Sequence, residues 1–99
     1  MDRDRALQIL REAAPELRRR YGVANARLFG SVARGTADTL SDVDVNIQFA
    51  GDRPDNSMSL CGVSGLLSEK FGLTVDVVAD PVRNPALRAA ILRDGVIAF

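Results

Sequence analysis

Residues 30–44 read GSVARGTADTLSDVD, and the rest of the chain is arranged around this stretch. It opens on Gly30 and Ser31, where a residue without a Cβ lets a ligand approach closely beside a hydroxyl group. It ends on Asp42 and Asp44, whose carboxylates are two residues apart. Taken alone, Gly30 and Ser31 could form an ordinary capped turn, and Asp42 and Asp44 could lie on a strand that faces water. Together, a phosphate-binding turn that leads into paired acids predicts nucleotide chemistry.

The two acids belong to a predicted strand, residues 42–49, in which apolar and polar side chains alternate strictly. Its polar face also carries Asn46 and Gln48, and side chains two positions apart on one face stand roughly 7 Å from each other. A shorter predicted strand, residues 26–29, runs into Gly30. The apolar face of the longer strand is expected in the core and comprises Val43, Val45, Ile47 and Phe49. The two acids therefore face the same space.

Carboxylates that share one face repel each other, because like charges a few ångströms apart disfavour joint ionisation. A divalent cation removes this conflict, and Mg²⁺ prefers one or two carboxylates together with substrate phosphates as ligands. Asp76 lies in a third predicted strand, residues 73–78, where its apolar neighbours favour a buried acid. Beside Asp44 it would complete a metal site; on an outer edge strand it would be an ordinary surface acid. Histidine is absent, so any metal must be held by oxygen.

Arg34 lies inside the opening stretch and carries a fixed charge that suits phosphate. A surface position without a ligand explains it equally well. The Walker pattern and the dinucleotide-binding pattern of three spaced glycines are both missing from the sequence. Gly30 and Ser31 therefore remain the candidate phosphate turn, with Arg34 as a candidate phosphate contact.

The N-terminal helix is predicted over residues 3–21, from apolar residues at alternating three- and four-residue steps, and ends at Gly22. Pro15 lies inside this pattern, so we expect a kink or a break near Ala13 or Ala14, because proline removes a backbone donor and crowds the preceding turn. Arg18, Arg19 and Arg20 at the end of the helix suit the helix dipole.

Two more helices follow. The first is predicted from apolar residues at Leu60, Val63, Leu67 and Phe71 and ends at Gly72. Asn56 or Ser57 is expected to cap it, and Cys61 to be buried in it as a small hydrophobe. The second begins at Asn84 and Pro85 and ends at Gly95. Residues 96–99 form either a last short strand or an apolar tail on the core. The order of elements predicts an α/β (α+β) domain, a small mixed β-sheet with helices packed on one side.

Composition limits the class of protein. A chain of 99 residues is expected to form one domain, residues 1–99. Its 13 basic and 13 acidic residues cancel, so no broad charge favours nucleic acid as a partner. Nowhere do about eighteen apolar residues run together, and a single cysteine suits a reducing compartment. A cytoplasmic protein without a membrane partner is the expectation.

Gly30-Ser31, then ten residues, then Asp42-Val43-Asp44, with Asp76 in a later strand, closely resembles the signature of the nucleotidyltransferase superfamily that includes DNA polymerase beta. The similarity covers essentially the whole chain and is greatest to the minimal nucleotidyltransferases. One departure is Asn46, because the family usually has an apolar residue there. The resemblance implies a nucleotidyltransferase-like fold.

The resemblance also implies an activity: Mg²⁺-dependent transfer of a nucleoside monophosphate from ATP or another nucleoside triphosphate to an acceptor, with two metal ions. By position, Gly30, Ser31 and Arg34 would bind the nucleotide, and the carboxylates of Asp42, Asp44 and Asp76 would be catalytic and hold the metal. In related bacterial pairs such a protein resembles the antitoxin of a small helical toxin of the HEPN type encoded nearby, and adds AMP to a toxin tyrosine.

Size leaves one alternative open. Larger relatives have a second domain that grips the base and the acceptor, and these 99 residues do not supply one. A partner protein or a second subunit in a homo-oligomer would then complete the site. The alternative is a non-catalytic antitoxin, a binding module that neutralises a helical partner by forming a complex.

Overall fold

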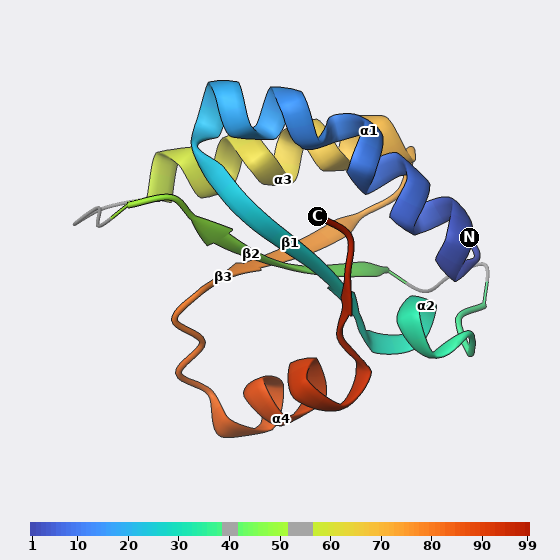
Figure 1. The fold of residues 1–99 in the computed structure, drawn as a ribbon. Coiled ribbons are helices and arrows are strands. Elements are labelled where there is room, and N and C mark those ends of the chain that lie inside the picture. Colours follow the sequence, from blue (N-terminus) through green and yellow to red (C-terminus); the bar gives the residue numbers. More distant parts are fainter. Residues whose placement is uncertain (39–41, 52–56) are drawn as a thin grey trace.

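The computed structural model describes residues 1–38, 42–51 and 57–99. Helices and strands alternate along most of the chain (Figure 1). In chain order they are α1 (Arg3–Tyr21), β1 (Val23–Phe29), α2 (Gly30–Arg34), β2 (Val43–Phe49), α3 (Ser57–Phe71), β3 (Val75–Ala79), α4 (Pro85–Asp94) and β4 (Val96–Ile97).

The strands form one mixed sheet in the order β3-β2-β1-β4. β1 pairs antiparallel with both β2 and β4, whereas β2 and β3 run parallel. The crossover between these two parallel strands contains α3, which packs with α1 over one face of the sheet (Figure 1). Helix α2 lies at the end of β1, and α4 lies across the sheet from α1 and α3, so the predicted packing on one side describes the two long helices and not α4 (Figure 1). The predicted α+β fold with a small mixed sheet is confirmed.

The strand β2 separates the core from a polar face. Val43, Val45 and Ile47 have no exposed surface and pack beneath α1 and α3. Asp44, Asn46 and Gln48 alternate with them and point to the other side, as the periodicity predicts. The face that carries the predicted acids is therefore the one that the two long helices leave uncovered.

Helix α1 continues through Pro15 without the predicted break. The proline is exposed, while Ala13, Ala14 and Leu17 around it are buried in the core. Burial of this apolar stripe outweighs the lost backbone hydrogen bond, because helical stability in proteins comes mostly from tertiary packing. The helix ends where predicted, at Gly22, whose φ is 71°.

Two other expectations, those for Cys61 and for the C-terminal residues, can be compared with the structure. Cys61 is exposed, so its predicted burial is wrong; α3 turns Val63 and Leu67 to the core instead. The predicted cap of this helix, at Asn56 or the Ser57 side chain, lies outside the described residues. The C-terminal residues form the short edge strand β4, followed by the buried Ala98. In the described part of the chain, no helix has the length and apolar character needed to cross a membrane.

Candidate active site

The turn from β1 into α2 is built around Gly30. Its φ is 77°, a conformation that side chains with a Cβ rarely adopt. A Cβ at this position would collide with Oδ2 of Asp44, which lies directly against the glycine. Ser31 follows, half-buried, at the start of α2, where no side chain caps the first backbone N–H groups. The predicted phosphate turn and the predicted metal-binding acid are therefore in contact.

Strand register brings Asp76 to Asp44. The two residues are partners in the parallel pairing of β2 and β3, and Asp42 immediately precedes β2. Asp76 is nevertheless exposed and lies on an edge strand, so its predicted burial is wrong. The sequence left two alternatives for Asp76, a place beside Asp44 and a place on an outer edge strand, and the structure shows both together.

Electrostatics at this face centre on Asp44, which is half-buried. Burial raises the pKa of its carboxyl above the usual value, and the charges of Asp76 and then Asp42 raise it further. The guanidinium of Arg34 opposes this rise. A carboxylate that is partly desolvated and faces two others is stabilised in its ionised form by an added cation.

The donor set fits Mg²⁺ only in combination with a substrate. Within residues 1–38, 42–51 and 57–99, no three potential ligands are gathered closely enough to hold a metal ion by themselves. Mg²⁺ is commonly bound by one or two carboxylates plus substrate phosphates, with waters filling the other positions. The mutual repulsion at Asp44 and the adjacent phosphate turn match that arrangement.

Arg34 ends α2 and forms an ion pair with Asp94 at the end of α4, with Nη1 2.7 Å from Oδ2. The Asp94 side chain is only 4% exposed, because Arg93 also covers it, with Nε 3.0 Å from Oδ1. Hydrogen bonds from Arg93 and then from Arg34 lower the pKa of Asp94 to about 2. Arg34 thus has a structural partner and is also close enough to Asp44 to influence its charge.

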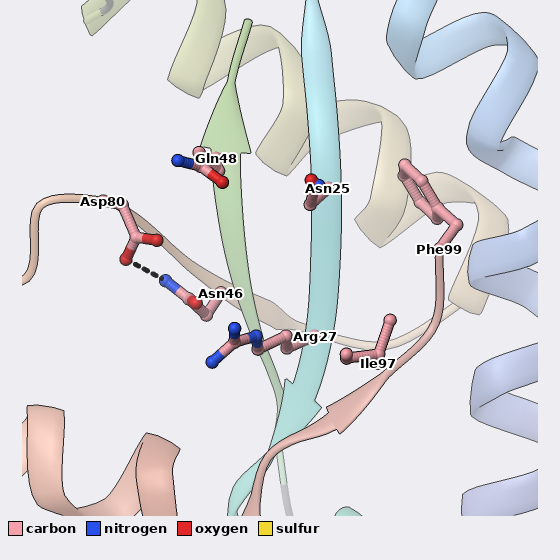
Figure 2. Close-up of a pocket in the computed structure, with 7 residues that line it drawn as sticks. All are labelled: Asn25, Arg27, Asn46, Gln48, Asp80, Ile97 and Phe99. Atoms are coloured by element: carbon pink, nitrogen blue, oxygen red, sulfur yellow. Dashed lines mark hydrogen bonds between the residues drawn. The ribbon is translucent and has the colours of Figure 1, made fainter.

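A polar hollow that sequence reasoning missed lies on the polar face of β2, where Asn46 and Gln48 line it (Figure 2). Arg27, Asn46 and Asp80 line it, and these three also line a second hollow under α4. Asn46 and Gln48 were recognised as part of the polar face but without a role. Arg27 and Asp80 gave no local signal, since only sheet pairing and the β3–α4 connection bring them to Asn46.

This arrangement defines a class of protein. A glycine-serine turn for phosphate beside acids on neighbouring strands of a mixed sheet is suited to enzymes that transfer nucleotidyl groups. The family model of the nucleotidyltransferase domain matches residues 10–97. The chain belongs to this family and is a nucleotidyltransferase, and the resemblance seen in the sequence is confirmed.

Individual relatives agree with this assignment. Protein adenylyltransferase MntA of Thermococcus cleftensis is 32% identical over 88 residues, which are 89% of this chain and 87% of the relative. A solved structure assigned as a minimal nucleotidyltransferase is 33% identical and superimposes with a TM-score of 0.74 over 97% of this chain and 95% of its own. The fold is also shared with one chain in the structure of the tri-AMPylated HEPN toxin of Shewanella oneidensis in complex with the MNT antitoxin. That chain is 20% identical and superimposes with a TM-score of 0.65 over 94% of this chain and 71% of its own.

Proposed function

We propose that this enzyme transfers AMP from ATP to a hydroxyl group of a partner protein, with Mg²⁺ held by Asp42, Asp44 and Asp76. The proposed acceptor is a tyrosine of a small helical toxin encoded nearby, which the transfer inactivates. The observation that carries the proposal is the register that sets Asp44 beside Asp76, with Asp44 against Gly30. The name of the Thermococcus cleftensis relative and the AMPylated toxin in the Shewanella oneidensis complex support this choice of acceptor.

Each residue has a distinct task in the proposed reaction. The turn at Gly30 and Ser31 binds the terminal phosphates through backbone N–H groups and the serine hydroxyl, and Arg34 adds positive charge. The acceptor oxygen attacks the α-phosphorus while the bond from phosphorus to the pyrophosphate oxygen breaks, and pyrophosphate leaves. Asp76, at the exposed edge where an acceptor can approach, takes the hydroxyl proton. Mg²⁺ neutralises the phosphates and stabilises the charge that develops on them.

Transfer of labelled nucleotide tests the proposal. The chain is incubated with α-labelled ATP, Mg²⁺ and the product of an adjacent gene for a small helical protein. We expect label on a tyrosine of that protein, and a loss of at least about 100-fold in rate with Asp76→Asn, because a positioned base typically contributes 10²–10⁴-fold. Glu69→Gln, which removes an exposed acid of α3, is the matched control and should transfer at the wild-type rate.

Two results would contradict catalysis by these acids. One is equal labelling by the wild type and an Asp42→Ala/Asp44→Ala double variant. The other is a stable complex with the partner, insensitive to ATP and Mg²⁺, in which no label appears. That second result would identify the chain as a non-catalytic binding module.

A further inference from the structure

The hollow on the polar face of β2 is a built feature of the sheet. We name it the sheet hollow, about 220 Å³ in volume and lined by Asn25, Arg27, Asn46, Gln48, Asp80, Ile97 and Phe99. The neighbouring hollow under α4, about 320 Å³, shares Arg27, Asn46 and Asp80 with it. Asn46 follows Asp44 by two residues on the same face of β2, roughly 7 Å along the strand. The sheet hollow and Asp44 therefore lie along the same face of one strand, at a separation that an extended nucleotide can span.

Asn46 is the buried polar residue of this region, with 3% of its surface exposed. Its Nδ2 donates to the carbonyl of Val78 at 3.3 Å and to Oδ1 of Asp80 at 3.0 Å. These bonds fix the orientation of the amide, and no donor among the described residues reaches its Oδ1. A buried acceptor left without a hydrogen bond is costly, so this oxygen takes its donor from the hollow, from water when the hollow is empty and from a ligand that displaces the water.

The surrounding groups complement that oxygen. Arg27 is exposed and has no ion-pair or hydrogen-bond partner in the described part of the chain, so its guanidinium is available to donate. Figure 2 shows Arg27 and Asp80 on either side of Asn46. Ile97 in this hollow and Leu92 in the neighbouring one are 64% and 74% exposed and offer apolar walls. The pattern is an acceptor next to a donor between apolar surfaces, which matches a flat heterocycle with an amine beside a ring nitrogen.

We propose that the sheet hollow is the base-recognition subsite, in which Asn46 Oδ1 accepts the 6-amino group of adenine and Arg27 donates to a ring nitrogen. The inference rests on the proposed function, because it places the base of the nucleotide whose phosphates lie at Gly30 and Asp44. It assigns a role to Asn46, whose amide is buried on the otherwise more exposed polar face of β2. A base with an oxygen at carbon 6, such as guanine or hypoxanthine, would place an acceptor against an acceptor and bind less well.

The test compares ATP with ITP, which has a carbonyl oxygen in place of the 6-amino group and carries a hydrogen on N1. Dissociation constants are measured by calorimetry with Mg²⁺ and without an acceptor protein. The wild type should bind ATP about five- to tenfold more tightly than ITP, the effect of one hydrogen bond lost at a buried group. Asn46→Leu, of similar shape, should reduce this ratio to about one. Gln8→Leu removes an exposed amide from α1 and should leave the ratio unchanged.

A ratio of affinities is insensitive to the fraction of folded protein. Should Asn46→Leu not fold, Asp80→Ala at an exposed position frees the Asn46 amide and should lower the ATP/ITP ratio in the same direction. The inference is overturned if the wild type binds both nucleotides equally, if neither variant changes the ratio, or if Asn46→Leu alters only the KM for the acceptor protein. Discrimination against ITP without any label transfer would overturn the proposed function and leave the base subsite standing.

Discussion

At Gly30, one missing methyl group determines how closely two parts of the site approach. The backbone is in the left-handed region, and the space that a Cβ would fill is taken by the Asp44 carboxylate. The turn and the acid are thereby packed against each other, which in the proposed reaction brings a triphosphate at the turn within reach of a metal at Asp44. Gly35 has the same φ of 77° but nothing within 4 Å of its Cβ position. Substitution at Gly35 therefore tests the effect of backbone strain alone, whereas substitution at Gly30 adds a collision with Asp44.

Gly30→Ala should lower the free energy of unfolding by about 2–3 kcal/mol, of which the left-handed conformation accounts for about 1–2 kcal/mol. The rest comes from displacement of Asp44, so binding of ATP with Mg²⁺ should also weaken at least tenfold. Gly35→Ala should show only the backbone cost and retain ATP affinity. Urea unfolding and calorimetry measure the two quantities. Wild-type ATP affinity in a folded Gly30→Ala protein would contradict the role given to this contact.

The candidate site was predictable where its residues are close in the sequence. Ser31, Asp42 and Asp44 follow from a turn and a two-residue alternation, which are local patterns. Asp76 needed the register of two parallel strands, which the sequence suggests only through the resemblance to a family. The partners of Asn46 were beyond prediction, because a hydrogen bond to Asp80 depends on the path of the chain after β3.

At the scale of elements, α4 is tied to the phosphate turn by an ion pair between helix ends. Arg34 closes the short helix α2, and Asp94 closes α4. The Asp94 carboxylate also binds Arg93 through Nε at 3.0 Å and Nη2 at 3.0 Å. A helix as short as α2 has little stability of its own, so contacts such as this one hold it in place.

The Arg34–Asp94 tie should be visible in the pH dependence of stability. The pKa of Asp94 is about 2 in the folded protein and about 3.9 when unfolded, so its contribution is present above about pH 4 and is lost as pH falls towards 2. Asp94→Asn should therefore lower the Tm at pH 6 by a few degrees, and the difference should shrink at pH 2.5. Thermal melts followed by circular dichroism measure this, with Glu69→Gln as the control. A difference that stays constant with pH would show that the charge of Asp94 is not the cause.

The elements themselves were predicted mainly from their ends. Gly22, Gly72 and Gly95 end helices, and Asn84 caps α4 by accepting from the N–H groups of Ala86 and Leu87 at 2.9 and 3.2 Å. Pro15 misled the prediction, because a local penalty of about 3 kcal/mol can be overcome by burial of the neighbouring residues, which the local pattern does not weigh. The prediction for Cys61 was also wrong. Gly62 and Gly65 interrupt the apolar periodicity of α3, so the local sequence does not show which side of this helix faces the core.

At the scale of the whole molecule, the fold brings one distant acid to a local motif. The crossover through α3 carries the chain from β2 to β3 and places Asp76 beside Asp44. Equal numbers of basic and acidic residues leave no strong overall field, so the raised pKa of Asp44 has local causes, first its partial burial and then repulsion by Asp76 and Asp42. The protein thereby keeps an electrostatic strain at Asp44, which the cation bound with the nucleotide would relieve in the proposed reaction.

That strain predicts how ligands affect the stability of the whole chain. ATP with Mg²⁺ at about 100 times its dissociation constant should raise the free energy of unfolding by about 2.7 kcal/mol, and the Tm by roughly 10 °C or more. Mg²⁺ alone should have little effect, because the described residues gather no complete set of ligands without the phosphates. Asp44→Asn should be at least as stable as the wild type without ligand, since it removes a half-buried charge facing two others, yet gain almost nothing from ATP and Mg²⁺. A full shift with Mg²⁺ alone, or an undiminished shift in Asp44→Asn, would mean that the acids do not bind metal together with nucleotide.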